Sequence, residues 1–181
     1  MSGGFPDDRK TKIKEVVSVI TPQEMKGYSL FSGLAENELI GIVNLCRRLA
    51  YDINMVIFDP DHPSENIFLV ADENEAIQIE IPIIDHADKI IIHTLSKGEV
   101  FGWTALGTQH VRTATARCLR PVKLIAINVK SLMQLLEKNH HTGYIVMKNL
   151  VDIINTRLSY TTVAFRHEIR IARGKLKVAV T

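Results

Sequence analysis

The sequence predicts a mainly β domain with helices at both ends, and two observations carry this prediction. Between Leu49 and Ile127 short apolar runs recur, and each is followed by residues typical of turns. Before and after this region, apolar residues recur at steps of three and four. Several short strands at such spacing are typical of a sandwich or barrel, whereas the flanking period is that of amphipathic helices. The 181 residues suit one domain with an appendage.

Residues 1–27 are predicted to form an N-terminal helical extension. The first ten residues are small and polar, but Ile13, Val16, Val17 and Ile20 then follow the spacing of one helical face. Thr21 and Pro22 interrupt this pattern. A second short helical piece is expected over residues 23–30.

A further helix is expected from Ala35 to Arg48. Leu39, Ile42, Val43 and Cys46 would form one apolar face. The basic pair Arg47–Arg48 would then lie near the C-terminus of the helix, where cations are favoured.

Six strands are expected from the apolar runs that follow. The third run shows the period of a strand most clearly, because isoleucines alternate there with Gln78 and Glu80. Turn residues such as Asp59–Pro60 separate the runs. The six runs cover residues 55–58, 66–71, 76–81, 89–95, 113–119 and 122–127.

The helical period returns after Asn128, which is a suitable N-cap. A short helix is followed by a long amphipathic one with a heptad-like seam. The seam consists of Met147, Leu150, Ile154, Leu158, Thr161 and Phe165. For residues 166–180 two structures remain open: a continued helix, which we prefer, or a hairpin that turns at Arg173–Gly174.

Residues 161–181 form a basic tail. They contain five cations and one acidic residue, whereas the whole chain has a net charge of only +2. A solvated helix end is the favoured interpretation. Contact with a protein partner, nucleic acid or an anionic membrane is the alternative. The cations are Arg166, Arg170, Arg173, Lys175 and Lys177.

Several classes of function lack their sequence signals. No GxSxG, HExxH or GxxxxGK[ST] motif occurs, so no catalytic residue is assigned. The seven histidines are scattered, and no metal site or bound cofactor is expected. No apolar run approaches the roughly 18 residues of a membrane span, and the N-terminus has no signal-peptide core. With two cysteines and no CxxC motif, the sequence predicts a soluble, cytoplasmic protein.

The segment from Lys97 to Cys118 has the features of an anion site. Gly102 would let the backbone approach a ligand closely, and a turn of small residues follows it. Backbone N–H groups at such a turn attract anions. Arg112, which precedes Thr113, would add charge-assisted hydrogen bonds to a phosphate.

This segment resembles the phosphate-binding cassette of cyclic nucleotide-binding domains. These are the modules of catabolite-activator-type transcription factors, protein kinase A regulatory subunits and cyclic nucleotide-gated channels. The family reads Phe-Gly-Glu-x-Ala-Leu and then Arg-x-Ala-Thr. Here the two pieces are Phe101-Gly102-Trp103-Thr104-Ala105-Leu106 and Arg112-Thr113-Ala114-Thr115.

The resemblance covers about residues 28–160, since Leu30–Leu34 and Ser64–Val70 also look like family segments. It implies a double-stranded β-helix, or jelly roll, flanked by N-terminal helices and a long C-terminal helix. It also implies that this helix covers the ligand and forms a homodimer. The implied ligand-binding residues are Gly102, Trp103, Thr104, Ala105, Leu106, Arg112 and Thr113.

One departure from the family pattern puts the ligand in question. Where the cassette has a glutamate that accepts a hydrogen bond from the ribose 2′-hydroxyl, this sequence has Trp103. An indole has one N–H donor and no acceptor. Two hypotheses follow: a regulatory sensor of a small anionic ligand, with a cyclic nucleotide as one candidate, or a ligand-free structural or protein-interaction module.

Transcription control is the third hypothesis. Bacterial relatives of this type carry a helix-turn-helix domain after the long helix. Here about twenty residues follow Tyr160, too few for such a domain. We therefore expect no DNA-binding domain on this chain.

Overall fold

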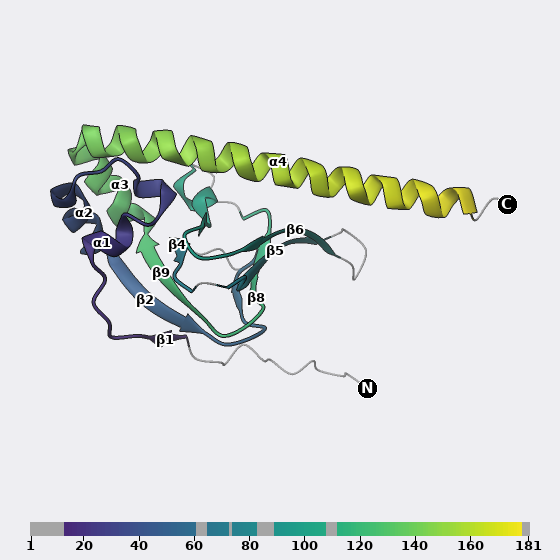
Figure 1. Cartoon of the computed structure of the whole chain (residues 1–181), viewed down its shortest axis with the longest axis horizontal. Coiled ribbons are helices and arrows are strands. Elements are labelled where there is room, and N and C mark those ends of the chain that lie inside the picture. The colour runs from purple at the N-terminus through teal and green to yellow at the C-terminus, as the bar shows by residue number, and fades with distance from the viewer. Residues whose placement is uncertain (1–12, 61–64, 73, 83–88, 108–111, 179–181) are drawn as a thin grey trace.

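Two antiparallel sheets face each other beneath a long helix in the computed structural model (Figure 1). The structure describes residues 13–60, 65–72, 74–82, 89–107 and 112–178, with side chains up to residue 171. The first sheet has the order β1 (Lys14–Glu15), β2 (Cys46–Tyr51), β9 (Val122–Asn128), β4 (Asn66–Val70) and β7 (Val100–Phe101). The second has the order β3 (Val56–Phe58), β8 (Thr115–Cys118), β5 (Ile77–Pro82) and β6 (Lys89–Leu95).

Helices cover the outer face of the first sheet (Figure 1). They are α1 (Pro22–Met25), the 3-10 turn η2 (Ser29–Phe31), α2 (Glu36–Val43), α3 (Val129–Lys138) and α4 (His140–Val178). A further 3-10 turn, η3 (Trp103–Leu106), follows β7. The fold class expected from the sequence is therefore confirmed: mainly β, with N-terminal helices and a long C-terminal helix.

The first sheet is buried on both faces, and two apolar cores result. One core lies between this sheet and the helices and includes Ile67 and Leu69 of β4. The other lies between the two sheets, where the rings of Phe68 and Phe101 stack with centroids 5.3 Å apart and Phe58 packs beside them. Double burial explains why β4 reads as a continuous apolar run instead of an alternating one.

All six expected strands are confirmed, with ends that shift by at most two residues. Residues 89–95 form β6 with the expected bounds. Asn128 caps α3 as expected, because its side chain accepts a hydrogen bond from the Ser131 N–H at 3.1 Å.

The helix expected over residues 12–20 is wrong for the residues that the structure describes. Residues 14 and 15 form β1, residues 16–20 form no helix, and the Val16 N–H donates to the Arg48 carbonyl at 2.9 Å. The segment is rich in β-branched residues, which favour extended backbone. Residues 1–12 of the predicted extension lie outside the described part of the chain.

The expected helix over residues 35–48 is too long. Helix α2 ends at Val43, and Cys46 to Tyr51 form β2, which pairs along its whole length with β9. The apolar spacing alone would continue the helix and place Cys46 on the face of Leu39 and Ile42. The backbone hydrogen bonds to β9 stabilise the strand more than this spacing stabilises a helix. The thiols of Cys46 and Cys118 are free, and burial raises the pKa of each to about 12.

Helix α4 is fixed at its N-terminal end and extends past the sheets at the other (Figure 1). The Thr142 hydroxyl donates to the Glu38 carboxylate at 2.6 Å, and the Ala35 N–H donates to it at 2.9 Å. These hydrogen bonds, with one to His141, lower the pKa of Glu38 to about 2. The 39 residues give a helix of about 58 Å.

Residues 166–178 continue this helix, so the hairpin alternative is wrong and the helical one is confirmed. The residues of the basic tail are helical as far as Val178, and residues 179–181 lie outside the described part.

Candidate functional site

A cavity of about 260 Å³ lies between the second sheet, the η3 turn and α4. Five residues of the predicted ligand site line it, namely Gly102, Trp103, Thr104, Arg112 and Thr113. The other described lining residues are Phe58, Ile79, Ile81, Ile92, Phe101, Ala114, Ile154, Arg157, Leu158 and Thr161. The cassette therefore faces α4 across one shared cavity. Residues 108–111 of the cassette lie outside the described part of the chain.

Ala105 and Leu106 are not among the described residues that line this cavity. Ala105 is buried in the core beneath the helices, and Leu106 packs against the same core. The Ala105 N–H donates to the Gly102 carbonyl at 3.3 Å and so closes the η3 turn.

Arg112 is buried, with 2% of its surface exposed. Its Nη1 donates to the Gly102 carbonyl and to the Thr104 hydroxyl, and its Nη2 donates to the Asn66 carbonyl at 3.1 Å. The guanidinium carbon also lies 4.4 Å from the ring centroid of Phe58. Burial lowers the pKa of Arg112 to about 10. In this structure Arg112 ties the cassette to β4 and to the inter-sheet core.

Gly102 makes this arrangement possible. Its φ is +78°, in the left-handed region that favours glycine. A Cβ at this position would lie 3.3 Å from Arg112 Nη1 and 3.3 Å from the Asn66 carbonyl oxygen. Gly102 thus allows the protein's own groups to approach the backbone, whereas the sequence had suggested the approach of a ligand.

We expect Gly102→Ala to lower the free energy of unfolding by at least about 1–2 kcal/mol, the usual cost of a left-handed conformation with a Cβ. Urea denaturation measures the loss. Gly107→Ala is a matched control, because Gly107 has φ −77° and its new Cβ would make only an ordinary contact. Equal stability of the two variants would show that the cassette backbone is not constrained at Gly102.

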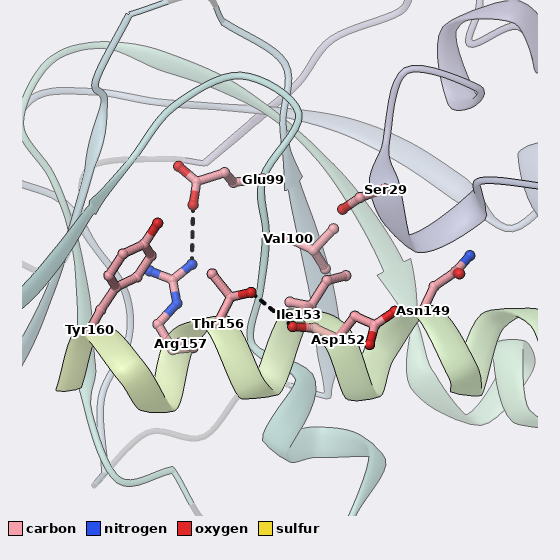
Figure 2. Close-up of a pocket in the computed structure, with 9 residues that line it drawn as sticks. All are labelled: Ser29, Glu99, Val100, Asn149, Asp152, Ile153, Thr156, Arg157 and Tyr160. Carbon is pink, nitrogen blue, oxygen red and sulfur yellow. Dashed lines mark hydrogen bonds and ion pairs between the residues drawn. The ribbon is translucent and has the colours of Figure 1, made fainter. Parts of the chain in front are cut away.

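A polar cluster on the other side of the cassette ties α4 to the barrel (Figure 2). Arg157 Nη2 donates to Glu99 Oε1 at 3.2 Å, and His93 Nε2 lies 2.9 Å from the same oxygen. The His93 ring stacks on Tyr160 with centroids 4.5 Å apart. These residues adjoin a second cavity of about 310 Å³, which is lined by Glu99, Arg157 and Tyr160 together with Ser29, Val100, Asn149, Asp152, Ile153 and Thr156 (Figure 2).

The charges in this cluster are partly buried. Burial alone would raise the pKa of Glu99. The opposing effect is larger: hydrogen bonds from His93 and the Ser96 N–H, together with the charge of Arg157, hold this pKa below its ordinary value. Burial lowers the pKa of Arg157, and the Glu99 carboxylate opposes this. The Glu99–Arg157 pair is therefore ionised at neutral pH and contributes a partly desolvated contact between α4 and the barrel.

Trp103 stands between the cavity and the polar cluster. Its ring packs against both apolar cores and lies 5.5 Å from the guanidinium carbon of Arg157. It therefore contacts the cassette, the barrel and α4 together, at the position where the family pattern has a glutamate.

Sequence reasoning expected the long helix to cover the ligand but named no residue of it as part of the site. Arg157, Ile154, Leu158 and Thr161 line the cavity. The seam included three of these four residues, but as a dimer interface. A single arginine inside an otherwise uncharged helical stretch, residues 153–165, is a signal that could have identified Arg157.

Two further classes of site find no support in the described residues. Within that part of the chain, no group of three or more histidine, cysteine or acidic side chains could hold a metal ion. No described helix combines the length and apolar character needed to cross a membrane.

Comparison with known proteins supports one family. The model of the cyclic nucleotide-binding domain matches residues 49–139. No curated protein matches the chain. Among solved structures, a protein of Geobacter metallireducens that is named as cyclic nucleotide-binding is 23% identical, with a TM-score of 0.65 over 77% of this chain and 98% of that one.

Two other solved structures have the same fold. The catabolite activator protein of Thermus thermophilus is 22% identical, with a TM-score of 0.63 over 76% of this chain and 62% of that one. The regulatory domain of Toxoplasma gondii protein kinase A, solved with cyclic AMP, is 15% identical, with a TM-score of 0.61 over 76% of this chain and 48% of that one. At such identities these structures show the jelly-roll fold alone.

Proposed function

Because the chain belongs to the family of cyclic nucleotide-binding domains, we propose that it is a regulatory sensor whose cavity under α4 takes a small anionic ligand. One observation carries this proposal: cassette residues line the cavity on one side and α4 residues line it on the other. A ligand in such a position contacts both parts. Its binding energy then depends on where α4 lies, which is the requirement for a conformational signal.

We further propose that α4 is the output element and forms a homodimer. The helix carries an exposed apolar stripe, the α4 stripe, which follows a heptad-like spacing along one face from the cavity to the part of the helix past the barrel. Exposed apolar patches on this scale favour a partner, and a second copy of a long helix is self-complementary about a two-fold axis. Leu150 of the predicted seam is buried in the core beneath the helices and Met147 packs against that core, so neither belongs to the stripe. The α4 stripe consists of Val151, Ile154, Leu158, Phe165 and Ile169.

Binding of cyclic AMP and cyclic GMP to the wild-type protein is expected to be weak or absent. The ribose 2′-hydroxyl would lose water without gaining a carboxylate acceptor, at a cost of about 1–3 kcal/mol. Trp103 also fills more space than glutamate. Isothermal titration calorimetry should therefore show tighter binding by Trp103→Glu than by the wild type, while Trp103→Phe, which restores no acceptor, should stay weak.

Tight binding by the wild type that is lost in Trp103→Glu would contradict this prediction and show that the indole stacks on the ligand. Absence of binding by all three proteins would favour the second candidate, a ligand-free interaction module. The hydrogen bonds between Arg112 and the protein's own oxygens favour that candidate.

A further inference from the structure

The cavity under α4 has an apolar body and cationic polar groups. Isoleucines of β5 and β6 and phenylalanines of β3 and β7 form its apolar wall on the barrel side. Its charged groups are the guanidinium groups of Arg112 and Arg157, and no described lining residue is a carboxylate. Such a wall favours a ligand with an apolar body and a negative charge.

Arg157 has a donor that the described residues leave unused. Its Nη2 is bonded to Glu99, but its Nη1 is buried and has no hydrogen-bond acceptor among them. A buried donor without an acceptor is costly, and the cost is largest for a charged group. Arg157 lines the cavity, so a rotation of its guanidinium group would bring Nη1 to an anionic ligand there, which would supply the missing acceptor.

The size and polarity of the cavity argue against a sugar phosphate. Its volume of about 260 Å³ lies just below the range of about 300–1,000 Å³ that is usual for small-molecule pockets. A ribose phosphate would bring several hydroxyl groups and a phosphate into it, and each needs partners. One unused guanidinium nitrogen matches a single carboxylate better than a phosphate, which brings two or three non-ester oxygens together with the hydroxyl groups of the sugar.

We propose that the ligand is a small carboxylate with an apolar body about the size of one substituted ring, and that Arg157 binds the carboxylate. This inference rests on the proposed sensor function of the same cavity. Arg157 belongs to α4, so the ligand would connect the barrel wall to α4 directly. Arg157 is then both the specificity-determining residue and the link to the output helix.

The test compares 4-tert-butylbenzoate with its neutral isostere 4-tert-butylbenzamide by isothermal titration calorimetry on the full chain. The two compounds have nearly the same shape and differ in charge. We expect the wild type to bind the acid about tenfold or more tightly than the amide, the usual effect of a hydrogen bond to a charged group. Arg157→Gln should abolish this preference. Arg166→Gln, an exposed arginine on the same helix outside the cavity, should retain it.

Equal affinity of the wild type for the acid and the amide would overturn the inference. This comparison uses the wild type alone, so it does not depend on whether a variant folds. Retention of the preference by Arg157→Gln would overturn the role of Arg157. If cyclic AMP binds the wild type more tightly than the benzoate, the ligand class is wrong and the sensor function stands. If none of the three compounds binds the wild type but cyclic AMP binds Trp103→Glu, the inference fails and the sensor function stands. If Trp103→Glu binds nothing either, both fail.

Discussion

Arg112→Ala is expected to lower the free energy of unfolding by about 2–4 kcal/mol. The substitution removes buried hydrogen bonds from a charged group, each of which contributes about 1.5–3 kcal/mol. It also leaves the carbonyls of Gly102 and Asn66 without this donor and removes the contact with the Phe58 ring. Urea denaturation followed by circular dichroism measures the loss.

Arg120→Ala is the matched control, because Arg120 is exposed and lies close to Arg112 in the sequence. Exposed substitutions of this kind usually change stability by less than about 0.5 kcal/mol. An Arg112→Ala protein as stable as the control would mean that Arg112 does not hold the cassette and is available to a ligand.

The pair of substitutions Phe165→Asp and Ile169→Asp is expected to convert a dimer into a monomer. Both residues belong to the α4 stripe and lie outside the cavity lining. If each of the two substitutions costs the dimer about 2 kcal/mol in total, as loss of a central apolar residue does, the dissociation constant rises about 10³-fold. Light scattering after size-exclusion chromatography gives the mass.

Val163→Asp is the control for this experiment. Val163 is 65% exposed, more than Phe165 at 38% or Ile169 at 54%, but it projects from a different face of α4. It should leave the dimer intact. A monomeric wild type at high protein concentration would contradict the proposed role of the α4 stripe.

The six expected strands after Leu49 were the most predictable part of the fold, because turn residues mark both ends of each apolar run. Residues 13–20 and residues 46–48 were predicted incorrectly for a common reason. Both have apolar residues at helical spacing, but both lie beside strands whose backbone groups need partners: β1 pairs with β2, and β2 pairs with β9. Pairing between strands that are distant in the sequence does not change the spacing of apolar residues within either strand, so the spacing cannot reveal it.

The cassette could be located from the sequence because its residues are neighbours along the chain. Its geometry could not be predicted from the sequence. Nothing local indicates that Arg112 turns inward to Asn66, which lies 46 residues earlier, or that Ala105 packs into the core beneath the helices. Arg157 was missed because it lies on a separate element, and only the fold brings it to Glu99 and Trp103.

Hydrogen exchange of the backbone amides of residues 154–161, with and without saturating 4-tert-butylbenzoate, tests most directly whether ligand binding in the cavity is reported by α4. The account predicts slower exchange in these residues of the wild type on ligand addition, and no such change in Arg157→Gln. Ligand binding measured by calorimetry with unchanged exchange in residues 154–161 would contradict the coupling between the cavity and α4.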